Sequence, residues 1–476
     1  MKYEIVIGLE VHVQLMTESK MFCGCSTKFG AEPNTQTCPV CLGLPGVLPV
    51  INGETIRMAV KTGIALGCEV SKFSKFDRKN YYYPDLPKNY QVSQYDKPLN
   101  VGGSITINVN GEKKKIGITR IHLEEDAGKL VHDIFGGSGV DLNRTGIPLL
   151  EIVSEPDMRL SEEAYAYLVS MKQCLKYLGV SDCNMEEGSL RCDANISIRL
   201  MGAKELGTKT EIKNLNSFAN VRKSLEYEAK RQKKVLEGSG KIVQETRLWD
   251  VEKEITVLMR TKEEAHDYRY FPEPDLVPVI LDDEYLRNVK KDVPEMPSER
   301  YNRFVKEYKL SEYDAGVLTG EKELADYYEA TVKYSSAPKK AANWVMGEFL
   351  KEINASRIAL SDVRVSPLSL SGLISLVEKG TISGKIAKEV FSEMFKTGKN
   401  PALIIKERGL VQISDETQIE EIIIKALSEN SKVVEDYKKG KKSAAGFMVG
   451  LVMKATKGKA NPKLVNEILR KKLEKL

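Results

Sequence analysis

Two close pairs of cysteines near the N-terminus form the sharpest local signal in the sequence. Cys23 and Cys25 are separated by one residue; after twelve further residues come Cys38 and Cys41, which are separated by two. Four thiolates on two tight turns can surround a zinc ion tetrahedrally. Because four protein ligands leave no open coordination position, the spacing predicts a structural zinc site rather than a catalytic one. The alternative is four buried free cysteines that pack as small apolar side chains.

Acidic side chains recur in several segments whose polar and apolar residues alternate. The clearest alternation runs through residues 4–15, where Glu10 and His12 share the polar face, and residues 191–199 repeat it with Asp193. Three further candidate strands, residues 119–126, 147–153 and 209–213, contribute Glu124, Glu125, Asp126, Glu151 and Glu211. Such alternation predicts an antiparallel sheet with one covered face and one open polar face.

Carboxylates on neighbouring strands repel each other unless a positive charge lies between them. Mg²⁺ is the expected cation, because it takes carboxylate oxygens and works beside substrate phosphates. Basic side chains that could contact those phosphates are Lys79, Arg191, Lys209 and Lys213. The sequence contains no glycine-rich P-loop, so a bound ATP would be held on the sheet face through metal. The alternative is a solvated polar face with scattered salt bridges.

The C-terminal stretch is rich in lysine. From Ser431 to Leu476 there are thirteen lysines and arginines against four acids, concentrated in residues 438–442 and 453–462. This surplus of positive charge suits a phosphate backbone, and the scarcity of aromatic residues favours backbone contacts over stacking on bases. The alternative is an ordinary lysine-rich helical face exposed to solvent.

The elements that must position these residues divide the chain into three parts. Up to about residue 293 the pattern is mixed, with period-two strands and a few helices, and beyond Pro294 it becomes helical. We therefore expect a multidomain α+β protein. Its expected parts are a catalytic domain at 1–293, a helical domain at 294–404 and a basic helical tail domain at 405–476.

Length and composition place the chain among ordinary globular proteins. It has 476 residues, 42% of them hydrophobic and 29% charged, and a net charge of +5. These values exclude a mostly disordered chain, a collagen-like fibre and a small disulfide-stapled scaffold. The N-terminal apolar run contains Glu4 and Glu10, unlike a signal peptide, and no stretch approaches the ~20 apolar residues that cross a bilayer. We expect a cytoplasmic protein with reduced cysteines.

Longer motifs spread over nearly the whole chain are similar to those of a known family. They are EIVIGLEVHVQ (4–14), CPVCLGLPG (38–46), YPDLPKNYQ (83–91), IHLEEDAG (121–128), DLNRTGIP (141–148), GSLRCDAN (188–195), KNLNSF (213–218), RYFPEPD (269–275) and GKANP (458–462). In these motifs the chain resembles the B subunit of the glutamyl/aspartyl-tRNA amidotransferases.

The resemblance implies a fold and an activity. The expected fold is a cradle like that of glutamine synthetase with an antiparallel sheet, followed by a helical domain and a small tail resembling the YqeY fold. The B subunit of this family is a carbon–nitrogen ligase that uses ATP and Mg²⁺ to phosphorylate the side-chain carboxylate of Glu-tRNA(Gln) or Asp-tRNA(Asn). Ammonia from a glutaminase A subunit then replaces the phosphate, and a small C subunit completes a heterotrimer.

The resemblance also assigns roles to residues. The expected Mg²⁺ ligands are Glu10, His12, Glu125 and Glu151, which with Lys79 form the catalytic group. Residues expected at the nucleotide or a second metal are Asp193, Glu211, Lys213 and Arg191, and Lys88 is a further candidate for phosphate or aminoacyl contacts. Residues expected to hold tRNA are Lys441, Lys442, Lys454, Lys457 and Lys459. Sequence alone does not separate Glu124, Glu125 and Asp126.

Missing motifs imply a partner. The chain has no amidase Gly-Gly-Ser-Ser segment and no evident glutaminase cysteine triad, so it should not release ammonia from glutamine alone. Two other interpretations stay open. The chain could be a zinc-stabilised tRNA-binding scaffold with a solvated acidic face, or a ligase of glutamine synthetase type that acts on free glutamate.

Overall fold

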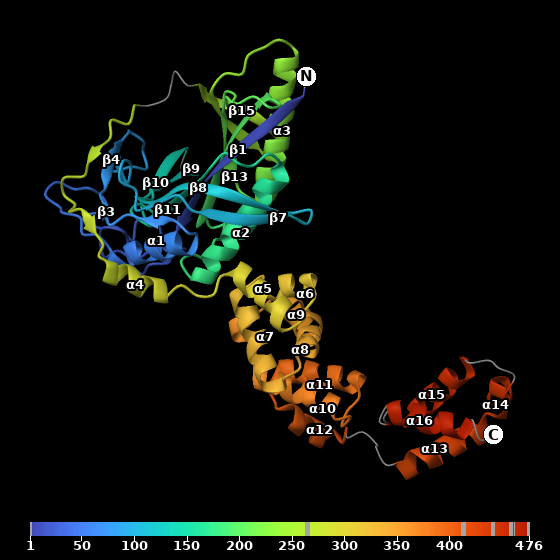
Figure 1. The fold of residues 1–476 in the computed structure, drawn as a ribbon. Coiled ribbons are helices and arrows are strands. Elements are labelled where there is room, and N and C mark those ends of the chain that lie inside the picture. Colours follow the sequence, from blue (N-terminus) through green and yellow to red (C-terminus); the bar gives the residue numbers. More distant parts are fainter. Residues whose placement is uncertain are drawn as a thin grey trace. The chain divides into compact units, whose positions relative to one another are not determined.

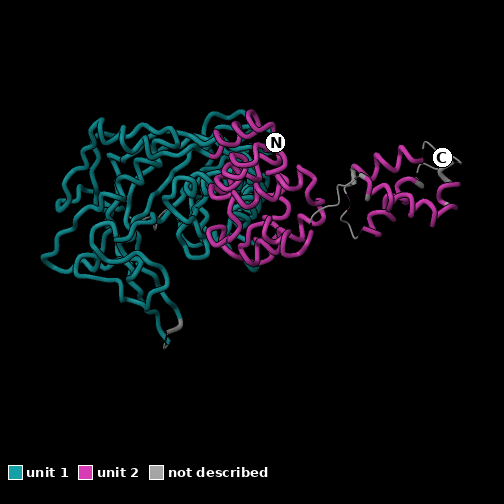
Figure 2. The backbone as a smooth tube through the Cα atoms, turned by 90° about the horizontal axis from the view of Figure 1, so that it is seen from below, with its two compact units in different colours: residues 1–296 teal, residues 297–476 magenta. Residues whose placement is uncertain are grey.

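The computed structural model describes residues 2–134, 136–261, 267–410, 416–438, 443–456, 460 and 462–473. The chain divides into two compact units, residues 1–296 and 297–476, drawn in teal and magenta in Figure 2. The first unit holds a large mixed sheet with helices, and all described elements of the second unit are helices. These elements confirm the predicted α+β class.

The first unit is built on a 13-stranded sheet (Figure 1). Its main path runs through β15 (Ile255–Thr261), β14 (Glu245–Asp250), β13 (Thr210–Leu215), β12 (Leu190–Leu200), β1 (Tyr3–Gln14), β11 (Pro148–Ser154), β8 (Glu112–Glu125), β5 (Tyr90–Ser93), β4 (Asp77–Asn80) and β16 (Phe271–Pro272). Off this path lie β2 (Glu69–Val70), β6 (Asn100–Val101) and β7 (Ser104–Val109). Two small sheets pair β9 (Lys129–Ile134) with β10 (Gly137–Asp141), and β3 (Phe73–Ser74) with β17 (Val279–Ile280).

One pairing departs from the predicted antiparallel sheet. β13 and β14 run parallel, whereas the other described pairs are antiparallel. The chain between these two strands forms the long helix α3 (Phe218–Glu237). A parallel pair needs a crossover connection of this kind, because a tight turn cannot bring the chain back to the same edge in the same direction.

Alternation along β1 separates the core from the polar face. Ile7, Leu9, Val11 and Val13 are all at most 1% exposed and belong to the main hydrophobic cluster. The intervening residues, from Gly8 to Gln14, are only partly buried. The core is completed by α1 (Gly53–Ala65), α2 (Ser161–Leu178), α3 and α4 (Asp283–Lys291). The strands thus present one face to the core and leave the other for chemistry.

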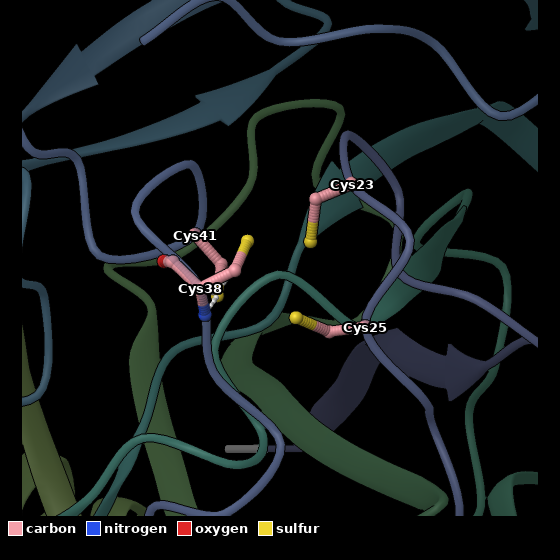
Figure 3. A group of neighbouring side chains, drawn as sticks. All are labelled: Cys23, Cys25, Cys38 and Cys41. Atoms are coloured by element: carbon pink, nitrogen blue, oxygen red, sulfur yellow. Dashed lines mark hydrogen bonds between the residues drawn. The ribbon is translucent and has the colours of Figure 1, made fainter.

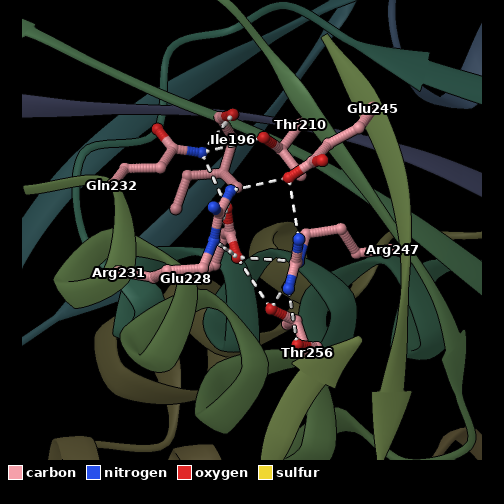
Figure 4. A network of polar contacts seen from close by, with 8 residues as sticks. All are labelled: Ile196, Thr210, Glu228, Arg231, Gln232, Glu245, Arg247 and Thr256. Carbon is pink, nitrogen blue, oxygen red and sulfur yellow. Dashed lines mark hydrogen bonds and ion pairs between the residues drawn. The ribbon is translucent and has the colours of Figure 1, made fainter. Parts of the chain in front are cut away.

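A buried polar network fastens α3 to the strands beneath it (Figure 4). Glu228 of α3 is fully buried, accepts a hydrogen bond from Thr256 of β15 at 2.8 Å and pairs with Arg231 at 2.6 Å. Arg247 of β14 and Glu245 complete a set of two acids and two arginines. Because a buried charge is tolerated only when it is paired, this set fixes the parallel edge of the sheet next to β13.

The long strand β8 begins in a tight hairpin. Val109 of β7 pairs with Glu112 of β8, and the two turn residues, Asn110 and Gly111, have φ values of 53° and 84°. An Asn-Gly turn with two positive φ values matches the right-handed twist of the strands that it joins. The hairpin therefore sets the register of β8 against β7 from its first residue.

The second unit contains two separate hydrophobic cores. One core, from Phe304 to Ile405, joins α5 (Pro297–Glu307), α6 (Glu312–Leu318), α7 (Lys322–Ser335), α8 (Pro338–Trp344), the π-helix Val345–Phe349, α9 (Leu350–Ser356), the 3₁₀ turn Leu360–Asp362, α10 (Pro367–Glu378), α11 (Gly384–Thr397) and α12 (Pro401–Arg408). The other joins α13 (Glu416–Glu429), α14 (Ser431–Lys438), α15 (Ser443–Ala455) and α16 (Pro462–Leu473). None of the described helices is both long and apolar enough to cross a membrane.

Candidate functional site

A row of three opposed polar residues crosses the middle of the sheet. His12 of β1 lies directly opposite Glu151 of β11, which in turn lies opposite His122 of β8. The Oε2 atom of Glu151 is 3.6 Å from His12 Nε2 and 3.2 Å from His122 Nε2. His122 is 2% exposed, so its imidazole is a buried support for the Glu151 carboxylate.

Glu124 completes a group of possible metal ligands. Its Oε1 atom is 3.5 Å from His12 Nε2, and the ligand atoms of His12, Glu124 and Glu151 all lie within 4.8 Å of one another. Two carboxylates and an imidazole nitrogen at this spacing fit a divalent cation. Glu124 is two residues from His122 and therefore shares its face of β8.

Glu125 lies outside this group, which differs from the expected ligand set. Its carboxylate accepts hydrogen bonds from the Lys88 ammonium and, at 2.9 Å, from the backbone N–H of Val92. Successive side chains of a strand point to opposite faces, so Glu124 and Glu125 cannot both face His12. Of the expected metal residues, the structure brings His12 and Glu151 together and joins Glu124 to them.

The electrostatics of this group reflect its burial. Burial, together with the charge of Glu151, raises the pKa of Glu124 to about 7. Burial would raise the pKa of Glu151 too, but the two histidines and Lys79 lower it below its ordinary value. Glu124 is thus a carboxyl whose charged form is disfavoured without a cation, and a bound cation would stabilise it.

A second acidic group lies beside the first. The ligand atoms of Glu10, Asp193 and Glu211 are within 4.8 Å of one another. Lys213 pairs with Asp193 and lies 3.2 Å from Glu211. Burial alone would lower the pKa of Lys213, but the charges of these two carboxylates raise it by more. The pKa of Lys213 therefore lies above its ordinary value. Glu10, expected in the first group, belongs here, where Asn195 donates to it at 2.9 Å.

Arg191 is held at the edge of a cavity of about 550 Å³. Its Nη2 atom is 2.8 Å from Oδ2 of the buried Asp126, which also accepts a hydrogen bond from Gln14 at 2.8 Å. The charged residues that line the cavity are the basic Lys28, Lys129, Arg144 and Arg191 and the acidic Asp141, Glu186, Glu187 and Asp193. The basic side chains, which lie beside the second acidic group, offer donors to a ligand that carries phosphates.

Lys79 of β4 is framed by aromatic rings. Its Nζ atom lies 4.8 Å from the ring centroid of Tyr268 and 5.8 Å from that of Tyr81. The positive charge is attracted by the faces of such rings, which limits where it can move. Sequence reasoning missed both tyrosines; the run of three tyrosines from Tyr81 to Tyr83 was a signal for the first, whereas nothing in the sequence marked Tyr268.

The four cysteines converge from two loops (Figure 3). Cys23, Cys25, Cys38 and Cys41 are all free thiols, and their Sγ atoms lie within 4.8 Å of one another. The Cys38 backbone N–H donates to Cys41 Sγ at 3.2 Å. A hydrogen bond from Cys23 is the main cause that lowers the pKa of Cys41 to about 4. Four soft sulfur donors at this spacing fit a structural zinc ion.

The residues expected to bind tRNA fall mostly outside the described part of the chain. Lys441, Lys442, Lys457 and Lys459 are not among the described residues. Lys454 is described, and it lies exposed in the last turn of α15. The prediction for this group therefore stays a prediction.

Comparison with family models identifies the class of protein. The sequence profile of the GatB/GatE catalytic domain matches residues 5–287, and a second profile, described as a GatB domain, matches residues 326–473. The first unit, with its two acidic groups on one sheet face, is thus a catalytic domain of this class. The second profile spans part of the first helical core of the second unit and all buried residues of its second core.

Curated relatives match over their full length. The B subunit of the aspartyl/glutamyl-tRNA(Asn/Gln) amidotransferase from Thermoanaerobacter sp. (strain X514) is 59% identical over 475 residues, covering 100% of both chains. Those of Carboxydothermus hydrogenoformans and Thermodesulfovibrio yellowstonii are 57% and 56% identical, again over 100% of both chains. The chain belongs to the family of aspartyl/glutamyl-tRNA(Asn/Gln) amidotransferase B subunits, which confirms the resemblance found in its motifs.

Proposed function

We propose that this chain is the ligase component that amidates Glu-tRNA(Gln), Asp-tRNA(Asn) or both, with ATP as the activating substrate. The observation that carries the proposal is the convergence of two acidic groups on one sheet face, His12, Glu124 and Glu151 in one and Glu10, Asp193 and Glu211 in the other. Membership of the amidotransferase B family supports the same conclusion.

The chemistry explains why such a face is needed. A carboxylate is a poor electrophile, so one of its oxygens first attacks the γ-phosphorus of ATP and the bond to the departing ADP breaks. Ammonia then attacks the acyl carbon, and phosphate leaves with its bridging oxygen. Mg²⁺ held by the acidic groups would neutralise the charge on the transferring phosphate.

The residues of the first acidic group would hold a cation and balance its charge. We assign His12, Glu124 and Glu151 as ligands of one cation, with His122 holding the Glu151 carboxylate through its Nε2–H. Lys79, which influences the pKa values of both glutamates, is assigned to the phosphate or the substrate carboxylate. A lysine at this place offers three donors to developing negative charge.

The second acidic group and the adjacent cavity are assigned to the nucleotide. Glu10, Asp193 and Glu211 would hold a second cation, and Lys213 would exchange its carboxylate partners for phosphate oxygens. Arg191 is already oriented by Asp126, so it offers its remaining donors to the cavity without further ordering.

The larger parts of the chain are assigned to tRNA and partners. We propose the divisions 1–293, 294–404 and 405–476 as a glutamine synthetase-like cradle, a helical domain and a YqeY-like tail. The two separate cores of the second unit support a division between a helical domain and a tail, with the first core continuing through Ile405 and α12 a few residues beyond 404. The lysines of the tail would contact the tRNA body through its phosphates. A glutaminase A subunit and a small C subunit would complete a heterotrimer.

A donor assay tests the need for a partner. The purified chain is incubated with misacylated tRNA, ATP and Mg²⁺, and with either ammonium or glutamine as the nitrogen source. We expect slow amidation with ammonium, and none with glutamine until the A subunit is added. Glutaminase activity from the chain alone would contradict the proposal.

A second assay separates the two rival functions. Leaving out tRNA and supplying free glutamate should stop ADP release, because the proposed substrate is the aminoacyl-tRNA. Continued ADP release would instead indicate a small-molecule ligase. A chain that binds tRNA but never releases ADP, with all subunits present, would be a scaffold.

A further inference from the structure

A lysine is buried beside the tetracysteine site. Lys20 is 0% exposed, and its Nζ atom donates to the carbonyl oxygen of Gln36 at 2.7 Å and lies 3.7 Å from Cys41 Sγ. A third contact joins Nζ to the carbonyl oxygen of Leu142 at 3.4 Å. A fully buried ammonium costs several kcal/mol unless an opposite charge compensates it.

The compensating charge does not come from a carboxylate. The contacts of Lys20 Nζ within the described part of the chain are two carbonyl oxygens and the Cys41 sulfur. The four thiolates around one Zn²⁺ would carry a formal charge of about −2. The neighbouring Lys20 ammonium would offset one unit of that negative charge. The zinc–thiolate group would in turn compensate the charge of the buried ammonium.

Lys20 also joins the cysteine loops to the segment before β11. Residues 141–147 lead directly into this strand, which carries Glu151. The backbone N–H of Met21 donates to the Gly146 carbonyl oxygen at 2.8 Å, beside the contact of Lys20 with Leu142. The loop between the cysteine pairs approaches the same segment, because Gln36 N–H donates to Asn143 Oδ1 at 2.8 Å.

We propose that Lys20 is the counter-charge of the tetracysteine metal site, and that through it the bound metal holds residues 141–147 in place. The metal, Lys20 and this segment form one unit, in which loss of the metal removes the constraint that keeps Cys41 Sγ beside the Lys20 Nζ atom. Lys20 is a positioning residue that touches neither substrate nor reacting atoms. The proposal rests on zinc occupancy of the cysteines and is independent of the amidation chemistry.

Charge and hydrogen bonding at Lys20 can be separated by substitution. Lys20→Gln keeps an N–H donor for the Gln36 carbonyl but removes the charge, Lys20→Met removes both, and Lys20→Arg keeps both. Lys233→Met, on the exposed face of α3, makes the same change of charge far from the cysteines and serves as the matched control.

The first measurement is zinc retention in the full-length chain. Zinc content is measured by mass spectrometry, and zinc release to a chromogenic chelator is followed after addition of a thiol reagent. Removing a partner that supports a metal ligand weakens metal binding by about 10- to 100-fold, so Lys20→Gln and Lys20→Met should both release zinc faster by about this factor. Lys20→Arg and Lys233→Met should behave like the unmodified chain.

The outcome that overturns the proposal is clear in this assay. Equal zinc release from Lys20→Gln, Lys20→Met and the unmodified chain would show that the ammonium does not compensate the metal site. Absence of zinc from the freshly purified unmodified chain would remove the proposed partner of the charge and overturn it as well.

The second measurement needs no substitution, so it holds even where a variant fails to fold. Hydrogen exchange is compared in the unmodified chain before and after removal of zinc by a chelator. Amides of residues 141–147 should exchange at least about tenfold faster in the chelated protein, while those of α7 should not change. Equal protection of residues 141–147 in both states would overturn the link to this segment.

Discussion

His12 and Glu151 lie directly opposite each other on β1 and β11, with 3.6 Å between Nε2 and Oε2. Their relation is fixed by strand pairing rather than by loop conformation. Strands hold side chains more rigidly than loops do, and the same pairing continues to His122 on β8. The first acidic group is therefore largely formed before any ligand binds.

Glu124 and Glu125 make a matched pair of variants for the metal site. Glu124→Gln should raise the Mg²⁺ concentration needed for half-maximal tRNA-dependent ADP release at least about 100-fold, because a ligand oxygen with its charge is lost. Glu125→Gln should leave this Mg²⁺ dependence unchanged, since its carboxylate contacts Lys88 and Val92 instead. The measurement is a Mg²⁺ titration of ADP release.

One pattern of results for these two variants would contradict the prediction. A shift in Mg²⁺ dependence with Glu125→Gln but not with Glu124→Gln would restore the ligand set expected from the resemblance alone. Both variants should bind tRNA as the unmodified chain does, which a filter-binding assay checks.

His122 should act through Glu151. In His122→Phe the ring volume is retained but the Nε2–H that supports the Glu151 carboxylate is lost. Second-sphere changes of this kind weaken metal binding by about 10- to 100-fold, so ADP release should need correspondingly more Mg²⁺. Saturating Mg²⁺ should restore most of the rate. His132→Phe, at an exposed residue of β9, is the control, and equal behaviour of the two variants would refute this role.

The alternation of polar and apolar residues was enough to predict the strands that carry the site. Alternation over residues 4–15 predicted one strand with Glu10 and His12 on a shared face, and the structure has β1 at Tyr3–Gln14. Alternation could not show whether Glu124 or Glu125 faces His12, because Glu124, Glu125 and Asp126 are consecutive acids at the end of β8. Which of them lies on the polar face is set by the pairing of β8 with β11. The parallel pairing of β14 with β13 was also missed. The side of β13 to which the chain returns depends on how the connecting helix α3 packs on the sheet.

Contacts between distant parts of the chain left even less trace in the sequence. Lys20 stands among ordinary polar residues, and only the fold brings it to Cys41 and Leu142. Likewise, Tyr268 meets Lys79 because β16 pairs with β4 almost two hundred residues earlier in the sequence.

Gly43 should tolerate alanine much less well than Gly46. Both residues have positive φ, 67° and 87°, which costs an L-residue about 1 kcal/mol. A Cβ at Gly43 would also overlap the side chain of Lys88, whereas one at Gly46 would meet open space. Gly43→Ala should therefore lower the free energy of unfolding by at least about 1 kcal/mol more than Gly46→Ala. Urea unfolding measures both, and equal losses would contradict the close approach.

Glu329 should make the helical unit sensitive to acid. Burial raises its pKa, but Arg303, Tyr308 and Arg300 outweigh that effect, and the net pKa is lowered. A lowered folded-state pKa stabilises the fold above the unfolded value of about 4.3, and this stabilisation is lost as the pH falls from there through the folded-state pKa. Glu329→Gln should therefore cost about 2 kcal/mol at pH 7 and less at pH 3.

Hydrogen exchange of α5 and α7 at both pH values measures this difference locally. Glu389→Gln, an exposed residue of α11, is the control and should change little at either pH. A cost for Glu329→Gln that is the same at pH 7 and pH 3 would contradict an ionised Glu329 in the fold.

The Asn110–Gly111 turn and the fourteen residues of β8 that follow it limit how the chain can vary in length. Side chains alternate without interruption from Arg120 to the end of β8, whereas the strand already carries one unpaired residue between Ile118 and Arg120. Inserting or deleting one residue between Arg120 and His122 would therefore turn His122 and Glu124 toward the core and bring Leu123 to the metal-binding face. Added residues at the hairpin tip, before this irregularity, would leave the phase intact. Evolution and engineering can therefore lengthen the chain at this tip, whereas a single-residue gap between Arg120 and His122 destroys the site without altering any of its residues.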